Sequence, residues 1–321
     1  MSSKGKILVI RGGAIGDFIL TLPVFAALRS QFPEAHLEVL GYPHIAQLAL
    51  VSGLVDRVQP IEARALAGFF ARNGELSEDL RDYFSEFNII LSYLYDPDEI
   101  FKTNIARCAL GQFLGGPHRP DETQPAHATE VYLKPLERLA IFAADPVPRI
   151  NLAGTGSTAS KIFLAGEEIR DAGERVPTIA LHPGSGSERK NWPEAKWSEF
   201  LRWLVESTPW QLLLIGGEAE GRRLEQLAQV LPDARCVVAR SRPLEELAVR
   251  LRACAAFVGH DSGITHLAAA VGLPTLVLWP HTPMEIWRPQ GNHVKILRAR
   301  NGLRELSVRA VTDEVRALLP L

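Results

Sequence analysis

Short apolar runs alternate with longer amphipathic segments along the first half of the chain. The runs predict strands at residues 7–10, 37–40, 57–61 and 88–93, and the segments between them predict helices at residues 18–31, 44–52 and 76–86. Strands and helices that alternate in this way are typical of a parallel sheet covered on both faces. Beyond residue 93 the pattern weakens, and it predicts a long loop at 115–129, a helix at 131–143 and a linker at 151–158.

The same alternation restarts at Ile179. It predicts strands from residue 179 and at 211–215, 235–238, 255–258 and 275–278, with helices at 194–206, 221–230, 244–253, 264–271 and 312–319. A chain of 321 residues exceeds what one hydrophobic core usually supports. We therefore predict an α/β protein with two Rossmann-like domains, residues 1–155 and 156–321, whose parallel sheets face each other across a cleft.

The composition excludes several classes of protein. A formal net charge of −2 provides no general attraction to nucleic acid, so no nucleic-acid partner is expected. Cys108, Cys236 and Cys254 form no CxxC pair and predict neither a disulfide framework nor a zinc site. No apolar stretch approaches the ~20 residues of a membrane span. We expect a cytoplasmic protein that contacts a membrane only peripherally.

One turn between a strand and a helix has the chemistry of an anion site. The apolar run 255–258 leads to Asp261, Ser262 and Gly263, and helical spacing begins at Ile264. Asp261 or Ser262 can cap this helix, whose free N–H groups and dipole would favour a phosphate. The alternative is a capped turn with a purely structural role, as in many parallel α/β proteins.

A second turn has similar chemistry. The strand that begins at Ile179 ends in a loop rich in glycine and serine, with Ser185 and Ser187, and Arg189 and Lys190 follow it. Small residues let the loop backbone surround phosphate oxygens, and Lys190 can add a mobile positive charge. The alternative for Lys190 is a solvated charge beside Arg189.

The first turn of the chain carries an acid instead. Asp17 lies between the strand at 7–10 and the helix at 18–31. An aspartate at this position repels phosphate, but it can accept the proton of a substrate hydroxyl. The alternative is a carboxylate that only caps the helix. One half of the chain thus has features for an anionic leaving group, and the other half offers a base.

Four motifs follow one another along the chain. They are Arg11-x4-Gly16-Asp17-x5-Pro23; His182-Pro183-Gly184-x-Gly186 with Lys190-x-Trp192-Pro193; Ile215-Gly216-Gly217-x-x-Glu220; and Asp261-Ser262-Gly263-x-x-His266-x-Ala268-Ala269-Ala270-x-Gly272-x-Pro274. Each motif alone is weak. In this order they span residues 7 to about 290 and resemble the glycosyltransferase family that includes the lipopolysaccharide heptosyltransferases, which has the GT-B double-Rossmann fold.

The resemblance implies an inverting, metal-independent transfer from a nucleotide-sugar, typically ADP-heptose, to a glycolipid acceptor of the lipopolysaccharide core, with no cofactor. It places Asp17 at the position of the general base. The donor would be held by Ser185, Ser187, Lys190, Glu218 or Glu220, Arg242, Asp261, Ser262, Gly263 and His266. For His266 a buried structural role is an equal alternative. Sequence spacing does not choose between Glu218 and Glu220 for the ribose.

The acceptor is expected to bind the first half of the chain. The short motif that begins at His127 resembles one on the acceptor side of family members, and we also assign Arg11 to the acceptor. The stretch 63–72 mixes arginines with paired phenylalanines, which mainly pack against the sheet. Arg57, Arg64 and Arg72 can meet the acidic groups of a lipid-linked saccharide at the inner membrane face.

Two further motifs are better explained without a ligand. Asp96-Pro97-Asp98 imitates the DxD metal motif of the other large glycosyltransferase fold, but it lies in the half opposite to the donor motifs, and an ordinary Asp-Pro turn explains it. Gly12-Gly13-x-x-Gly16 lacks the spacing of the dinucleotide fingerprint, and the second strand ends at Gly41, where NAD binding would require an acid. Neither a metal site nor an NAD-linked oxidoreductase is expected.

Two other functions share most of these features. A glycosyltransferase of the same fold could use another nucleotide-sugar or a protein acceptor, because the motifs address phosphate and ribose. A non-catalytic module that binds a nucleotide-sugar would share the donor motifs as well. An acid at Asp17 argues against that module, since binding a diphosphate does not use it.

Overall fold

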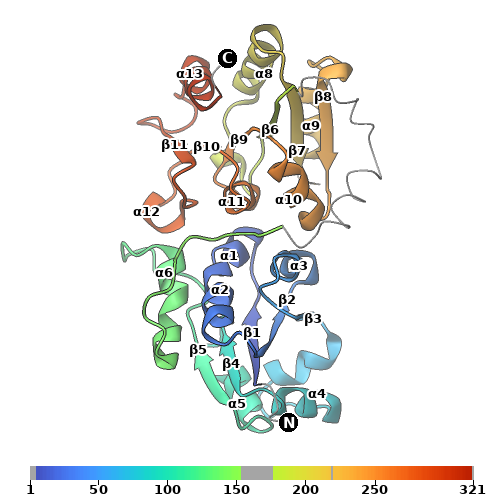
Figure 1. Cartoon of the computed structure of the whole chain (residues 1–321), viewed down its shortest axis with the longest axis vertical. Coiled ribbons are helices and arrows are strands. Elements are labelled where there is room, and N and C mark those ends of the chain that lie inside the picture. The colour runs from blue at the N-terminus through green and yellow to red at the C-terminus, as the bar shows by residue number, and fades with distance from the viewer. Residues whose placement is uncertain (1–4, 153–175, 218–219, 320–321) are drawn as a thin grey trace. The chain divides into compact units, whose positions relative to one another are not determined.

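The computed structural model describes residues 5–152, 176–217 and 220–319. The chain divides into two units, Met1–Gly154 and Thr155–Leu321 (Figure 1). Each unit contains one parallel sheet flanked by helices, which confirms the predicted α/β class with two parallel sheets. The domain boundary expected at residue 155 lies outside the described residues.

The sheet of the first unit has five strands in the order β3-β2-β1-β4-β5. The strands are β1 (Lys6–Arg11), β2 (His36–Gly41), β3 (Arg57–Pro60), β4 (Ile89–Ser92) and β5 (Gln112–Gly115). The helices are α1 (Ile15–Ile19), α2 (Leu22–Gln31), α3 (Pro43–Val51), α4 (Glu78–Ser85), α5 (Ile100–Ala106), α6 (Ala128–Leu133) and the 3-10 helices η1 (Arg64–Phe70) and η2 (Lys134–Leu139). Because β2 and β4 flank β1, the carboxyl end of β1 is a topological switch point, where ligands bind in sheets of this kind.

Burial explains why the central strand of this unit is recognisable from sequence. Every residue of β1 after Lys6 is buried, as expected for a strand covered on both faces. One face of the sheet packs on a cluster that includes Leu8, Phe69 and Phe84. Phe69 is fully buried, whereas Phe70 is 46% exposed, so the packing expected of the paired phenylalanines is confirmed for Phe69.

The sheet of the second unit has six strands in the order β11-β10-β9-β6-β7-β8. The strands are β6 (Thr178–His182), β7 (Gln211–Gly216), β8 (Cys236–Arg240), β9 (Ala256–His260), β10 (Thr275–Leu278) and β11 (Val294–Leu297). The helices are α8 (Glu194–Ser207), α9 (Gly221–Ala228), α10 (Leu244–Arg252), α11 (Gly263–Ala270), α12 (Met284–Trp287), α13 (Val308–Leu318) and the 3-10 helices η4 (Glu188–Lys190) and η5 (Asp233–Arg235). Here β6 is the strand at the switch point, between β7 and β9.

Prolines explain the two helices that differ most from their predicted form. The helix predicted at 18–31 is two helices, α1 and α2, and Pro23 lies in the first turn of α2. Proline has no N–H to donate and crowds the preceding turn, so the helix restarts there. The helix predicted at 131–143 begins earlier, at Ala128, and changes to the 3-10 helix η2 with Pro135 in its first turn.

Among the described strands and α-helices, four have no counterpart in the sequence prediction: β5, β11, α5 and α12. Both strands lie at sheet edges and contain exposed residues, so they lack the fully buried apolar run that marks a central strand. The two helices are short, with seven and four residues. None of the described helices combines the length and hydropathy that a membrane crossing requires.

Candidate functional site

The carboxyl ends of β6 and β9 bring two Gly-containing turns of the second unit together. The strands are neighbours, with His182 beside Gly259 in register. After β9, the Ser262 hydroxyl oxygen accepts a hydrogen bond from the N–H of Thr265 at 3.3 Å and caps α11. Of the two expected caps, Ser262 is therefore the one observed. Gly263 is the first residue of α11, so the unpaired N–H groups of this helix begin at the switch point.

Lys190 is the last residue of η4, and its side chain reaches the segment that precedes α11. Its Nζ is 2.7 Å from Oδ2 of Asp261, and the hydroxyl of Thr282 donates to the same oxygen at 2.9 Å. The Asp261 side chain is 9% exposed, whereas that of Lys190 is 35% exposed. Asp261 thus joins the loops that follow β6, β9 and β10. It holds an accessible cation beside the positive end of α11, and the two together favour an anion.

The two serines of the loop after β6 differ in what they contact. Ser185 is buried, and its hydroxyl lies 2.7 Å from Oδ1 of Asn191 and 2.8 Å from the carbonyl oxygen of Ser187. The Ser185 oxygen also accepts from the Ser187 N–H at 3.3 Å. Ser185 therefore shapes the loop from inside. The Ser187 side chain is partly exposed, and Gly186 is exposed.

Two histidines are the last residues of the strands that lead into these turns. His182 ends β6 and His260 ends β9, and both are buried. Burial lowers the pKa of His182 to about 3, with a further contribution from His260. Burial also lowers the pKa of His260 to about 4, against an opposing hydrogen bond to Gly184. Nδ1 of His182 lies 3.2 Å from the hydroxyl of Ser262. Both rings are neutral at physiological pH.

Of the residues expected near the nucleoside, the structure describes Glu220 and Arg242 but not Glu218. Oε2 of Glu220 accepts from the N–H of Gly217 at 2.9 Å, and its side chain packs on Gly184, where an added Cβ would lie 2.1 Å from Glu220 Cγ. Arg242 is half-exposed, 3.8 Å from Oε1 of Glu246. Glu218 lies outside the described residues.

His266 lies one turn into α11 and is 5% exposed. The burial fits the structural alternative that the sequence left open. Its contact with a donor stays a prediction.

In the first unit, Asp17 lies in the first turn of α1, after β1. Its Oδ2 accepts a hydrogen bond from the N–H of Ala14 at 3.1 Å. Gly13 has φ +98, and a Cβ at this residue would lie 3.1 Å from Oδ2 of Asp17. Glycine is therefore needed for both the backbone conformation and the close approach. The Asp17 side chain is 30% exposed, so capping the helix and accepting a proton are compatible.

Arg11 is 2% exposed. Its Nη1 donates to the carbonyl oxygen of His118 at 2.9 Å, and its Nη2 donates to the carbonyl oxygen of Asp17 at 3.2 Å. The guanidinium also lies 4.5 Å from the centre of the Tyr132 ring, a cation–π contact. Arg11 thus holds the turn that carries Asp17. Its direct contact with an acceptor stays a prediction.

The other expected acceptor residues are dispersed. Arg57 is the first residue of β3, so it lies at the amino end of that strand, whereas Asp17 lies beyond the carboxyl end of β1. Its Nη1 is 3.8 Å from Oε1 of Glu38. Arg64 is exposed at the start of η1. His127 is buried and caps α6, since it accepts from the N–H of Thr129. The structure therefore does not bring Arg57 to the carboxyl ends of the strands, where Asp17 lies.

The Asp-Pro motif of the first unit has structural contacts. Both carboxylate oxygens of Asp96 accept backbone N–H groups, from Phe101 at 3.1 Å and from Lys102 at 3.0 Å. Asp98 lies 3.2 Å from Arg72. Residues 5–152, 176–217 and 220–319 contain no group of three His, Cys, Asp or Glu side chains arranged for a metal ion. The turn expected at Asp96-Pro97-Asp98 agrees with these contacts.

A model of glycosyltransferase family 9 (heptosyltransferase) matches residues 151–313 of the chain. The chain is also 34% identical over 302 residues to lipopolysaccharide heptosyltransferase 1 of Pseudomonas aeruginosa, a match that covers 86% of this chain and 79% of that protein. The chain belongs to glycosyltransferase family 9. It is therefore a transferase, similar to the heptosyltransferases, and the resemblance seen in its motifs is confirmed.

Solved structures of family 9 proteins have the same fold. The glycosyl transferase of Veillonella parvula DSM 2008 has a TM-score of 0.79 at 17% identity, and the match covers 99% of this chain and 98% of that one. The Escherichia coli heptosyltransferase WaaC with ADP has a TM-score of 0.72 at 20% identity, covering 98% and 99%. The predicted GT-B type of fold is thereby confirmed.

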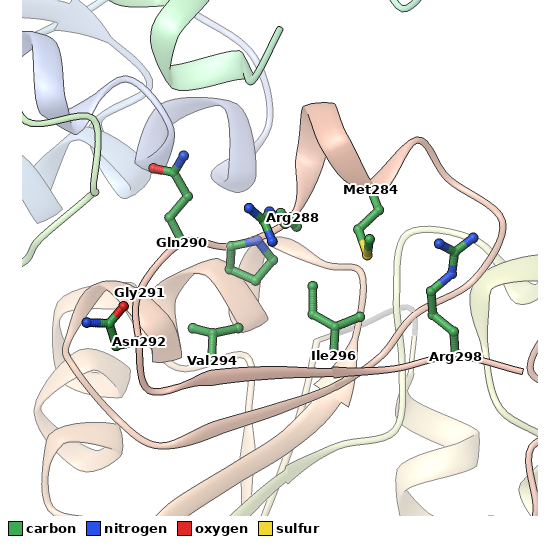
Figure 2. Close-up of a pocket in the computed structure, with 9 residues that line it drawn as sticks. Met284, Arg288, Gln290, Gly291, Asn292, Val294, Ile296 and Arg298 are labelled. Atoms are coloured by element: carbon green, nitrogen blue, oxygen red, sulfur yellow. The ribbon is translucent and has the colours of Figure 1, made fainter. Parts of the chain in front are cut away.

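This family 9 glycosyltransferase has a cavity that the sequence does not indicate. It has a volume of ≈ 470 Å³ and lies in the second unit, between α12 and β11 (Figure 2). Val294 and Ile296 line it from β11, with Met284, Arg288 and Arg298 around them. Two residues before α12, Thr282 bonds to Asp261. The sequence does not predict this cavity, because its pattern predicts neither α12 nor β11.

Proposed function

We propose that this chain transfers a heptose, or a related sugar, from an ADP-sugar to a lipid-linked saccharide acceptor of the lipopolysaccharide core type. The reaction inverts the anomeric carbon and needs no metal ion. The observation that carries the donor half is Lys190, held by Asp261 beside the capped amino end of α11. The Pseudomonas aeruginosa relative is named a lipopolysaccharide heptosyltransferase, and the Escherichia coli structure contains ADP, which support this choice of donor.

The proposed reaction is a displacement at the anomeric carbon. An acceptor hydroxyl attacks that carbon, the bond from carbon to the β-phosphate oxygen breaks, and ADP leaves with the bonding electrons. Negative charge grows on the diphosphate as this bond breaks. Lys190 and the N–H groups of α11 are fixed donors that would stabilise this charge in the transition state.

Asp17 takes the proton of the attacking hydroxyl in this proposal. Its Oδ2 accepts from the N–H of Ala14, which fixes the carboxylate, and Oδ1, which lies 4.0 Å from Nη2 of Arg11, would act as the base. Arg11 keeps the turn in place through the Asp17 carbonyl oxygen. Asp17 and Lys190 thus have separate roles in this proposal. Substitution of Asp17 should lower the rate of transfer, and substitution of Lys190 should lower the affinity for the donor.

Cationic residues of the first unit would bind the acidic acceptor. Arg64 is exposed on η1 and suits this role better than Arg57, which lies at the amino end of β3. We propose that the acceptor is presented at the cytoplasmic face of the inner membrane, where a lipid-linked saccharide meets the protein from the membrane surface.

Nucleotide binding measured by calorimetry tests the donor half. We expect ADP to bind more tightly than UDP or GDP. Replacing Lys190 with alanine removes a charge-assisted contact worth about 1.5–3 kcal/mol, so the affinity for ADP should fall roughly 10- to 150-fold.

Arg189→Ala is the matched control, because Arg189 is the adjacent cation and is exposed. It should leave the affinity for ADP within about twofold. Tighter binding of UDP or GDP would move the protein to another donor. An equal loss in the two variants would mean that general charge, rather than the placed Lys190, attracts the nucleotide.

A further inference from the structure

His260 connects β9 to both ends of the loop that carries Lys190. Its Nε2 lies 2.9 Å from the backbone nitrogen of Trp192, and its Nδ1 lies 3.1 Å from the carbonyl oxygen of Gly184. The N–H of Trp192 can only donate, so Nε2 accepts. The carbonyl of Gly184 can only accept, so Nδ1 carries the proton. Both nitrogens of one neutral ring are therefore used by the loop.

The surroundings of His260 keep the ring in this state. The residue has no exposed surface, and its ring meets that of Trp197 edge-on, with centroids 5.6 Å apart. Burial lowers its pKa to about 4, so the proton that would turn Nε2 into a donor is absent at physiological pH. A protonated ring would direct an N–H at the N–H of Trp192, which would break that contact.

The loop that carries Lys190 and the end of β9 are connected by two separate contacts. Lys190 lies two residues before Trp192, and its Nζ reaches Asp261, the residue that follows His260. The two segments are thus joined twice, once by the backbone contact of His260 and once by the ion pair of Lys190. Within the loop, Ser185 contacts Asn191 at 2.7 Å. The position of the Lys190 ammonium therefore depends on where His260 holds the loop.

We propose that His260 is a positioning residue, which fixes the loop at residues 183–191 so that Lys190 stands at the amino end of α11. His260 does not touch the substrate in this arrangement and acts through Lys190. The inference rests on the proposed binding of the donor diphosphate at this site. It predicts that the effects of His260 and Lys190 on nucleotide binding are coupled.

Three substitutions separate the two contacts of the ring. The amide nitrogen of His260→Asn can take the place of Nδ1 and donate to Gly184. The amide oxygen of His260→Gln can take the place of Nε2 and accept from Trp192. His260→Phe keeps the ring against Trp197 and makes neither hydrogen bond.

The matched control is His293→Asn. His293 is a partly buried histidine of the same unit, and its Nε2 lies 2.9 Å from the carbonyl oxygen of Ala269, near the carboxyl end of α11. It contacts the same helix as the site but at the opposite end. This variant should bind ADP within about twofold of the wild type.

The decisive experiment is a double-mutant cycle on the affinity for ADP, measured by calorimetry. We expect His260→Phe to weaken binding about tenfold, and the Asn and Gln variants to weaken it less. In the Lys190→Ala background, His260→Phe should add less than about a twofold loss, because its effect passes through Lys190. Full additivity, or wild-type affinity in His260→Phe, would overturn the inference.

Hydrogen exchange and nitrogen NMR test the contacts between His260 and the loop without any nucleotide. The amide of Trp192 should exchange faster in the Phe and Asn variants than in the wild type, and its protection should be retained in the Gln variant. The wild-type ring should show the Nδ1–H tautomer. Unchanged protection in all variants would contradict the positioning role. Wild-type protein that fails to bind ADP, but shows these loop effects, would instead contradict the proposed function.

Discussion

The contacts of Asp17 are compatible with both of the uses that the sequence allows, a helix cap and the proposed base. Its Oδ2 caps the start of α1 through the N–H of Ala14, and the side chain remains 30% exposed. The buried Arg11 holds this turn through the Asp17 carbonyl oxygen, and its Nη2 also lies 4.0 Å from Oδ1 of the carboxylate. The arrangement suits a base that must be held in one position.

Replacing Asp17 with asparagine separates these uses. The amide oxygen can still accept from the N–H of Ala14, so the helix cap is retained, but the amide cannot take a proton. We expect the rate of sugar transfer in single turnover to fall by about 10²- to 10⁴-fold. The affinity for ADP should stay within about twofold, and calorimetry provides that control. A variant with near wild-type rate would exclude Asp17 as the base.

The sequence predicts the polar residues of the proposed donor site more readily than the residues that support them. Lys190, Asp261 and Ser262 stand out because they follow apolar strands and precede helices. The inward direction of Ser185 and the contacts of His260 depend on atoms distant in the sequence. No local sequence pattern indicates such contacts, so they cannot be predicted from the sequence.

Among the elements, the start of α11 is the one on which the proposed function most directly depends. Ser262 caps it and also lies 3.2 Å from Nδ1 of His182. A cap of this kind contributes about 1 kcal/mol. Ser307 caps α13 in the same way, accepting from the N–H of Ala310 at 3.2 Å, but it belongs to a helix without a proposed site.

Replacing each serine with alanine should therefore produce the same loss of stability with different functional results. We expect Ser262→Ala and Ser307→Ala each to lower the free energy of unfolding by about 1 kcal/mol in urea. Only Ser262→Ala should weaken ADP binding, by several-fold, because fraying misdirects the first N–H groups of α11. Equal affinities for ADP in the two variants would show that the amino end of α11 takes no part in binding.

The apolar run that predicts a strand is clearest where burial is complete, although the partly exposed β3 and β8 are also predicted. β1 and β9 are buried along nearly their whole length, and their apolar runs predict them. The edge strand β11 contains only partly buried or exposed residues, so no run marks it. Pro23 and Pro135 divide helices that periodicity alone presents as continuous.

At the scale of the whole molecule, the alternation of strands and helices predicts two parallel sheets but not the order of their strands. The order places β1 between β2 and β4, and β6 between β9 and β7. These positions create the switch points at which Asp17 and Lys190 lie. Strand order depends on contacts between distant segments, which a single sequence does not report.

The two buried histidines make the stability of the second unit depend on pH. Unfolded histidine has a pKa near 6.5, whereas the pKa values of His182 and His260 in the folded protein are about 3 and about 4. Between these limits the unfolded state binds more protons, so lowering the pH favours unfolding. The stabilisation is fully present above pH ~6.5 and is lost progressively as the pH falls toward 4.

Tryptophan fluorescence measures this effect, because all six tryptophans lie in the second half of the chain. We expect the free energy of unfolding in urea to fall between pH 7 and pH 5, by up to about 1.4 kcal/mol per pH unit for each histidine. His260→Gln should make the slope shallower. A free energy that is constant or rises as the pH falls through this range would contradict the neutral buried histidines.

Transfer of the sugar itself is the reaction that the proposed function requires. The protein is incubated with ADP-heptose and a heptose-deficient lipopolysaccharide core, and the acceptor is examined by mass spectrometry. We expect the acceptor to gain the mass of one heptose with the wild type, with ADP released in equal amount, and no gain with Asp17→Asn on the same timescale. An acceptor left unmodified by a wild type that binds ADP, or modified equally by both proteins, would contradict the proposed reaction.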